Sequence, residues 1–160
     1  MISLGHSPAT LDQLLDGPLR NKVAKLRLPT LIESRETSTI ANLCRNPDAA
    51  MRNLIAKCLD DVDWLSWRDV VDAARDSADP LLLPRMLRSR REPEADAIRH
   101  DLLVNGRPSS RARILEHLHG RPIPESIVEL LPSLSEDSDP LIAQSATSLM
   151  DDNRALGADV

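Results

Sequence analysis

Arginine is concentrated between residues 85 and 121 of this sequence. That stretch holds nine arginines against five acidic residues, which gives it a net charge of +4. Because a guanidinium group makes planar, two-pronged contacts with carboxylates and phosphates, such a cluster is suited to an anionic partner. A solvated basic rim and a nucleic-acid surface stay open as alternatives. The candidate partner-binding arginines are Arg85, Arg88, Arg90, Arg91, Arg107, Arg111 and Arg113, and Arg121 closes the stretch.

Two tryptophans form a second candidate set for partner binding. Trp64 and Trp67 are three residues apart, which places them on one face of a predicted helix over 64–76 together with Val71 and Ala74. Core packing is the first interpretation, because a chain without Phe or Tyr has few other bulky side chains. The alternative is a contact with a partner, since tryptophan is enriched at the centres of binding surfaces.

Residues that catalyse reactions or bind metals are present without the spacing that such sites require. The sequence contains no glycine loop before Lys-Ser/Thr, no Gly-x-Ser-x-Gly and no His-Glu-x-x-His. His117 and His119 are two residues apart, so on a helix they point to different sides. The acid clusters, such as Asp60–Asp61 and Glu136–Asp137, stand at predicted helix boundaries, where acids cap the next helix. We therefore expect no enzymatic activity, no cofactor and no metal.

The remaining composition indicates a cytoplasmic protein. No apolar run approaches the roughly 18 residues that a membrane-spanning helix needs, so we expect no membrane association. Residues 1–7 are not followed by the apolar segment of a secretory signal. Cys44 and Cys58 each fall within an apolar helical face, where we expect them as small buried side chains in a reducing compartment.

Helices must position all of these residues. The chain has 26 leucines and 16 alanines, which favour helix, and few of the residues that favour strands. Apolar residues recur at spacings of three and four over Met51–Leu59, Ile127–Leu134 and Ile142–Met150, as one-sided helices require. We expect an all-α fold of eight to ten helices.

Proline and glycine mark where these helices begin and end. Proline is tolerated at the first helical position, and a preceding Asn, Asp or Ser can cap the helix. A glycine after an apolar stretch can end a helix in the left-handed conformation. The predicted starts are Ser7-Pro8, Asn46-Pro47, Asp79-Pro80, Pro93, Pro108, Pro124 and Asp139-Pro140, and the predicted ends are Gly17, Gly106 and Gly120.

One pattern recurs along about 100 residues. Asn46-Pro47-Asp48 leads to Met51-Arg52, Glu92-Pro93 leads to Ile98-Arg99, and Asp139-Pro140 leads to Ile142, with the aliphatic anchors 47 and 44 residues apart. This pattern resembles the second helix of HEAT-type (HEAT/armadillo-like) repeats, although Ala143 stands where the repeat carries arginine. The resemblance implies a short right-handed superhelical stack of antiparallel helical hairpins. We expect one such domain over 1–151 and a frayed tail over 152–160.

A stack of this kind presents an extended surface to other molecules. The leading hypothesis is a non-enzymatic protein-interaction module, a scaffold, adaptor or regulator, for which the arginines favour an acidic protein partner. The alternative is a nucleic-acid binder that uses residues 85–121, similar to the HEAT-like DNA glycosylases. The overall charge of −5 and the near absence of aromatic residues make that alternative less favourable.

Overall fold

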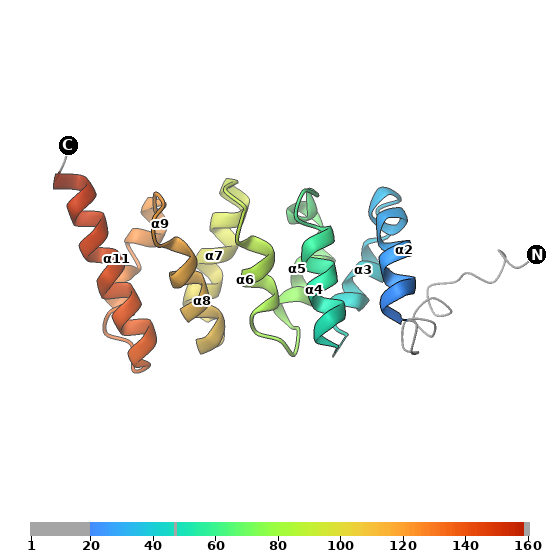
Figure 1. Ribbon diagram of the computed structural model, residues 1–160. Coiled ribbons are helices and arrows are strands. Elements are labelled where there is room, and N and C mark those ends of the chain that lie inside the picture. The colour runs from blue at the N-terminus through green and yellow to red at the C-terminus, as the bar shows by residue number, and fades with distance from the viewer. Residues whose placement is uncertain (1–19, 47, 159–160) are drawn as a thin grey trace, which may run out of the picture. The chain divides into compact units, whose positions relative to one another are not determined.

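The computed structural model describes residues 20–46 and 48–158 (Figure 1). Every regular element in these two ranges is a helix, and neither range contains a strand, so the all-α prediction is confirmed for the described part of the chain. The chain divides into two compact units, Met1–Met86 and Leu87–Val160. Each unit is described by itself.

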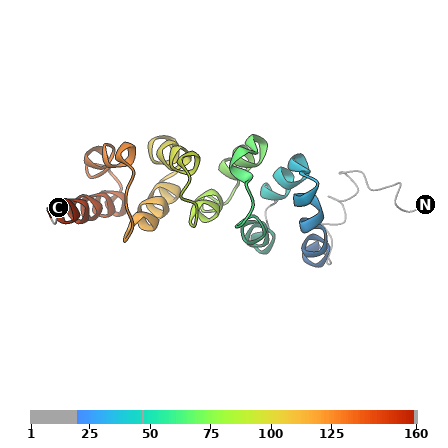
Figure 2. The ribbon, with the colours of Figure 1, turned by 90° about the horizontal axis from the view of Figure 1, so that it is seen from above.

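Unit 1 is a two-layered group of short helices. It contains α2 (Arg20–Glu33), α3 (Thr37–Cys44), α4 (Ala49–Cys58), the 3-10 helix η2 (Trp64–Ser66), α5 (Arg68–Arg75) and α6 (Leu82–Leu87), whose last residue belongs to unit 2. Each of α2 and α3 contacts the helix that follows it and also the next but one, so α2 and α4 share one layer while α3 and α5 share the other (Figure 2). The fully buried side chains between the layers include Leu28, Ile40, Met51, Ile55, Leu59 and Trp64.

Unit 2 has the same two-layered organisation. It contains α7 (Pro93–Asn105), α8 (Pro108–Leu118), α9 (Glu125–Val128), α10 (Leu131–Leu134) and α11 (Pro140–Ala158). α7 contacts α9 in one layer, α8 contacts α11 in the other, and the pairs α7–α8 and α10–α11 join the two layers (Figure 2). The core between them is aliphatic, and includes Leu103, Ile114, Leu115, Ile127, Leu131, Ile142 and Leu149.

One loop geometry recurs at three helix starts in the described residues. A polar side chain accepts the N–H of an aspartate two residues later, and the carboxylate of that aspartate accepts an N–H at the start of the next helix, where amides lack helical partners. In the first hydrogen bond the backbone N–H of the aspartate donates to the earlier side chain: Asp48 to Asn46 (2.9 Å), Asp79 to Ser77 (3.2 Å) and Asp139 to Asp137 (2.8 Å). In the second hydrogen bond a later backbone N–H donates to the carboxylate of that aspartate: Ala50 to Asp48 (2.8 Å), Leu81 to Asp79 (3.0 Å) and Leu141 to Asp139 (2.9 Å).

This geometry refines the predicted proline starts. Asp139-Pro140 opens α11 as expected, but α4 is capped by Asp48 rather than by Asn46, and Pro47 lies outside the described residues. α6 begins at Leu82, two residues after the predicted Pro80, because the Asp79 carboxylate holds Leu81 in the turn. Pro93 and Pro108 are the first residues of α7 and α8, whereas Pro124 precedes α9; Ser7-Pro8 lies outside the described range.

The two described glycines at helix ends differ from each other. Gly120 has φ +79°, the left-handed conformation that was predicted. Gly106 has φ −77° and ψ 167°, so the left-handed prediction is wrong there. Glycine is required at position 106 because a side chain does not fit there: a Cβ would lie 2.3 Å from the carbonyl oxygen of Leu102. Gly17 lies outside the described residues.

The C-terminal helix is longer than the sequence suggests. The helix α11 continues to Ala158, through residues 152–158 of the segment that was expected to fray. Leu149, Asn153 and Leu156 keep the helical spacing, and Asp151 and Arg154 form an ion pair one turn apart (3.8 Å), which favours helix beyond the predicted end.

Candidate functional site

The turn that follows α6 carries three of the candidate arginines, Arg88, Arg90 and Arg91. Arg99 of α7 lies behind this turn and is only 2% exposed. Its guanidinium donates to the carbonyl oxygens of Leu87 (2.5 Å) and Arg90, and to the carboxylate of Asp96 (2.7 Å). Arg99 was not among the candidates, yet it fixes the backbone on which they stand.

Arg121 holds the same turn from a second side. Its Nη1 donates to the carbonyl oxygen of Arg88 (3.1 Å), while its Nε donates to the carbonyl oxygen of His117 (2.8 Å) at the end of α8. The last carbonyls of a helix have no helical partners, so the bond to His117 satisfies one of these acceptors in α8. Arg121 therefore links the loop after α8 to the turn after α6, a role that its place in the sequence does not reveal.

Arg88 and Arg91 are the members of the turn that remain available. Both are exposed, and no described residue forms a hydrogen bond or ion pair with either side chain. Arg90 is different, since it is buried and its guanidinium lies 3.4 Å from the Glu92 carboxylate. The turn thus presents two free guanidinium groups on a backbone held by two others.

A pocket of about 330 Å³ opens beside this turn. We call it the arginine pocket: it is lined by Arg90, Arg91, Arg99 and Arg121, by Asp96, and by Leu118 and residues 122–124. Among its described lining residues Asp96 is the one acid, and that carboxylate is already bound by Arg99. An anion entering the pocket would meet cationic donors without a competing free carboxylate.

Burial and neighbouring arginines together lower two pKa values in this region. Burial lowers the pKa of Arg121, and the charges of Arg99, Arg91 and Arg88 lower it further against the opposing effect of Asp96. Burial and then the charge of Arg88 lower the pKa of His117 to about 4, so its imidazole is neutral at pH 7. Burial is the largest cause in both cases, and the charges of the neighbouring arginines act in the same direction.

Arg88 stands on the same turn but does not line the arginine pocket, and the remaining candidate arginines do not join it either. Arg85 belongs to unit 1, where it contacts Asn53 (2.5 Å) and Asp79 (3.9 Å). Arg111 is bound to Asp137 (2.6 Å), and Arg113 lies 3.3 Å from Glu116. Arg107 is the residue before α8 and has an extended backbone. Arg111 and Arg113 are occupied by ion pairs within unit 2.

The tryptophans do not share one helix, so that prediction is wrong. Trp64 lies in η2, the chain turns at Trp67, and α5 begins at Arg68, because the Trp67 N–H closes a 3-10 turn on Trp64 (2.9 Å). Trp64 is fully buried, as its core interpretation predicts. Trp67 is half-buried and lines a shallow groove with Thr37, Asp69 and Asp72.

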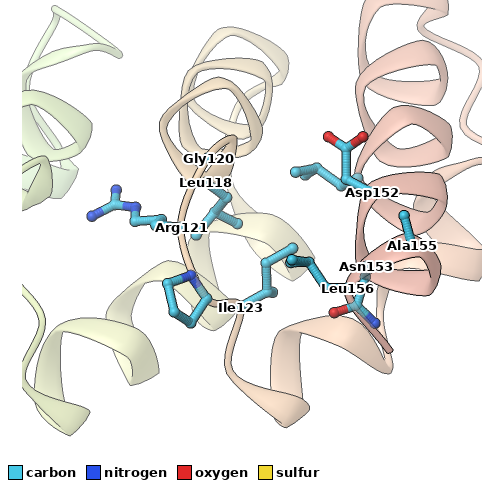
Figure 3. Close-up of a pocket in the computed structure, with 10 residues that line it drawn as sticks. Leu118, Gly120, Arg121, Ile123, Asp152, Asn153, Ala155 and Leu156 are labelled. Carbon is cyan, nitrogen blue, oxygen red and sulfur yellow. The ribbon is translucent and has the colours of Figure 1, made fainter. Parts of the chain in front are cut away.

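A second pocket, of about 470 Å³, adjoins the arginine pocket (Figure 3). We call it the apolar groove: it lies between the loop after α8 and the last turns of α11, and its apolar side chains are Leu118, Pro122, Ile123, Leu149, Ala155 and Leu156. Figure 3 shows Ile123 and Leu156 approaching each other across it, while the Arg121 side chain points away from α11. The two pockets share Leu118 and residues 121–123 as a common wall.

Neither of the two cysteine thiols is activated. Burial raises the pKa of the Cys44 thiol to about 12, and it also raises that of Cys58, so neither is an activated nucleophile. The described residues contain no group of His, Cys, Asp and Glu side chains that could hold a metal ion. None of the described helices is both long and apolar enough to cross a membrane.

No protein-family model, curated protein or solved structure matches this chain. Whatever the chain binds must therefore be inferred from its own geometry. Among the described residues, the arginine pocket and the apolar groove are the features that combine volume, exposed functional groups and a defined framework.

Proposed function

We propose that this protein is a non-enzymatic interaction module that binds an acidic segment of a protein partner at the arginine pocket. The observation that carries the proposal is that two arginines hold the turn while two others on it remain free. The side chains of Arg99 and Arg121 bind backbone carbonyl oxygens and hold the turn. Arg88 and Arg91 stand on that turn, are exposed, and have no partner among the described residues. Because the backbone of the turn is already held in place, binding a carboxylate does not have to order the turn itself.

A HEAT-type architecture is the framework that we propose for this module. Within each unit the helices alternate between two layers, and the same capping loop recurs at three helix starts. In each unit an arginine also reaches from one helix to the loop that opens a later one, as Arg52 does to Asp79 (3.2 Å) and Arg111 to Asp137 (2.6 Å). These recurrences support a stack of helical pairs, with the right-handed superhelix as its proposed arrangement.

A protein partner fits this site better than nucleic acid does. Binding to duplex DNA requires a row of Lys or Arg side chains along the phosphate backbone, and these side chains must not be paired with acids of the protein itself. Here Arg111 and Arg113 are paired with acids, so they add no free cations to the two that Arg88 and Arg91 place on one turn. A compact pocket with a few guanidinium groups matches individual carboxylates of a peptide.

The proposal can be tested by selecting random displayed peptides on the immobilised protein. We expect the selected peptides to be enriched in Asp and Glu, and to bind the double variant R88E/R91E about tenfold more weakly, the effect of losing about 1.4 kcal/mol. R27E is the matched control, because Arg27 is an exposed arginine of α2 in unit 1. Equal binding by R88E/R91E and R27E would overturn the proposal.

A separate titration with duplex DNA tests the alternative. If the arginine pocket serves nucleic acid, duplex affinity should fall steeply with salt and should be lost in R88E/R91E. If DNA binding is absent, or is insensitive to these substitutions, that alternative fails. Urea unfolding of each variant establishes that the charge reversals leave the fold intact.

A further inference from the structure

We infer that the bound segment carries a large apolar side chain close to its acidic residue, and that this side chain docks in the apolar groove. The inference rests on the proposed function and names its specificity. Its starting point is the wall that the two pockets share, formed by Leu118 and residues 121–123. A ligand that crosses this wall contacts both pockets at once.

The two sides of the wall have different chemistry. Arg121 points away from α11 and lines the arginine pocket, whereas Ile123 points toward Leu156 across the apolar groove (Figure 3). Only two positions along the chain separate these side chains, so the contrast occurs over less than about 7 Å of extended backbone. A peptide with an acidic residue and an apolar residue one or two positions apart matches this change from a cationic to an apolar surface.

The groove contains exposed aliphatic surface that the fold leaves uncovered. Leu156 is 63% exposed although it lies beside Leu118 and Leu149, which are buried. A volume of about 470 Å³ lies within the usual range of ligand sites, roughly 300–1,000 Å³. Covering this surface with an apolar side chain removes it from water, which is the main source of affinity at protein interfaces.

The charges around the groove set the direction in which a segment binds. Asp152 lines the groove, and its carboxylate lies 3.6 Å from Nδ1 of His119, so a carboxylate of the ligand is repelled on this side. The arginine pocket attracts the same carboxylate on the other side of the wall. The acid of the ligand is thereby directed to the arginines and its apolar neighbour to Ile123 and Leu156.

The wall itself is rigid enough to keep the two pockets in register. Pro122 and Pro124 fix φ at two positions of the loop, and Arg121 anchors the loop to the carbonyl oxygens of His117 and Arg88. A preorganised wall means that a ligand does not have to order the loop when it binds.

The test compares two charge insertions on one helix. Leu156 and Leu141 are exposed leucines of α11, 63% and 67% exposed, but only Leu156 lines the groove. We expect L156E to weaken binding of the selected peptides by about tenfold, and L141E to leave it unchanged. With a peptide whose apolar residue is replaced by alanine, L156E should weaken binding less than it does with the parent peptide, as expected when the two groups contact each other.

The outcomes separate this inference from the function on which it rests. If R88E/R91E abolishes peptide binding while L156E does not change it, the apolar groove is not used and the acidic-partner function stands. If neither variant changes binding, both fail. If the wild type dimerises on sizing columns and L156E alone prevents it, a second copy of the chain covers the groove, and the inference is overturned.

Discussion

Arg111 of α8 and Asp137, in the loop before α11, form an ion pair with 2.6 Å between Nη2 and Oδ2. The other oxygen of Asp137 accepts the N–H of Asp139 at 2.8 Å, so one carboxylate shapes the loop that opens α11 and also ties that loop to α8. The Asp139 N–H and then the Arg111 guanidinium lower the pKa of Asp137 below its usual value.

The first prediction concerns this carboxylate in acid. Since its pKa is lowered by folding, the stability it contributes is fully present above its ordinary pKa of 3.8 and is lost as the pH falls through the lower, folded value. D137N should therefore reduce the free energy of unfolding at neutral pH and flatten its fall below pH 3.8. Urea unfolding across this range measures both. In the control variant D151N, which changes an exposed acid of α11, the free energy of unfolding should fall with pH as steeply as in wild type.

The second prediction uses His117 as a reporter of the arginines. Its pKa is about 4, and Arg88, Arg113 and Arg121 lower it while Glu116 opposes them. Between pH 6.5 and 4 the unfolded chain binds a proton that the folded chain does not, so stability should fall as the pH falls across this window and level off below it. H117Q should lose this dependence. In NMR titrations R88A should raise the pKa of His117, and R27A should not; an unchanged value in R88A would contradict the electrostatic assignment.

The third prediction separates the two glycines. G120N should be nearly neutral, because asparagine tolerates the left-handed backbone at φ +79° and nothing lies within 4 Å of an added Cβ. G106N should cost about 1–3 kcal/mol, because the Cβ would meet the Leu102 carbonyl oxygen at 2.3 Å. Thermal and urea unfolding of both variants give the comparison. Equal losses would show that backbone conformation, and not space, governs both positions.

The fourth prediction concerns the buried Arg99. R99K keeps the charge but cannot reach the carbonyl oxygens of Leu87 and Arg90 and the Asp96 carboxylate together, because an ammonium lacks the guanidinium fork. Losing one charged hydrogen bond costs about 1.5–3 kcal/mol, so R99K should be destabilised by about this amount. R91K, at an exposed arginine of the same turn, serves as the control and should unfold like wild type.

The fold could be predicted from the sequence more completely than the candidate site. The Asp-Pro pairs and the three-and-four spacing identified helices because both signals are local. Trp64 was placed correctly in the core, since no Phe or Tyr competes for that role. The break at Trp67 was missed, because it depends on a hydrogen bond between Trp67 and Trp64 that the sequence pattern alone does not specify.

The candidate site was harder to predict because its organising residues bind backbone atoms. Seven arginines looked equivalent in sequence, but Arg111 and Arg113 meet acids of unit 2 and Arg85 meets Asp79. Arg99 was noted only for its part in the repeat pattern. Its partners are the carbonyl oxygens of a turn, and no residue type marks where a carbonyl will point.

The recurring capping loops also bear on how fast the chain reaches its structure. In each of them both hydrogen bonds close within four residues, so a helix start at Asp48, Asp79 or Asp139 needs no distant partner. Chains whose contacts are mostly local fold in roughly microseconds to milliseconds, because little loop-closure entropy precedes the first favourable contacts. We expect each unit to fold within that range, with its helix boundaries set before the helices meet.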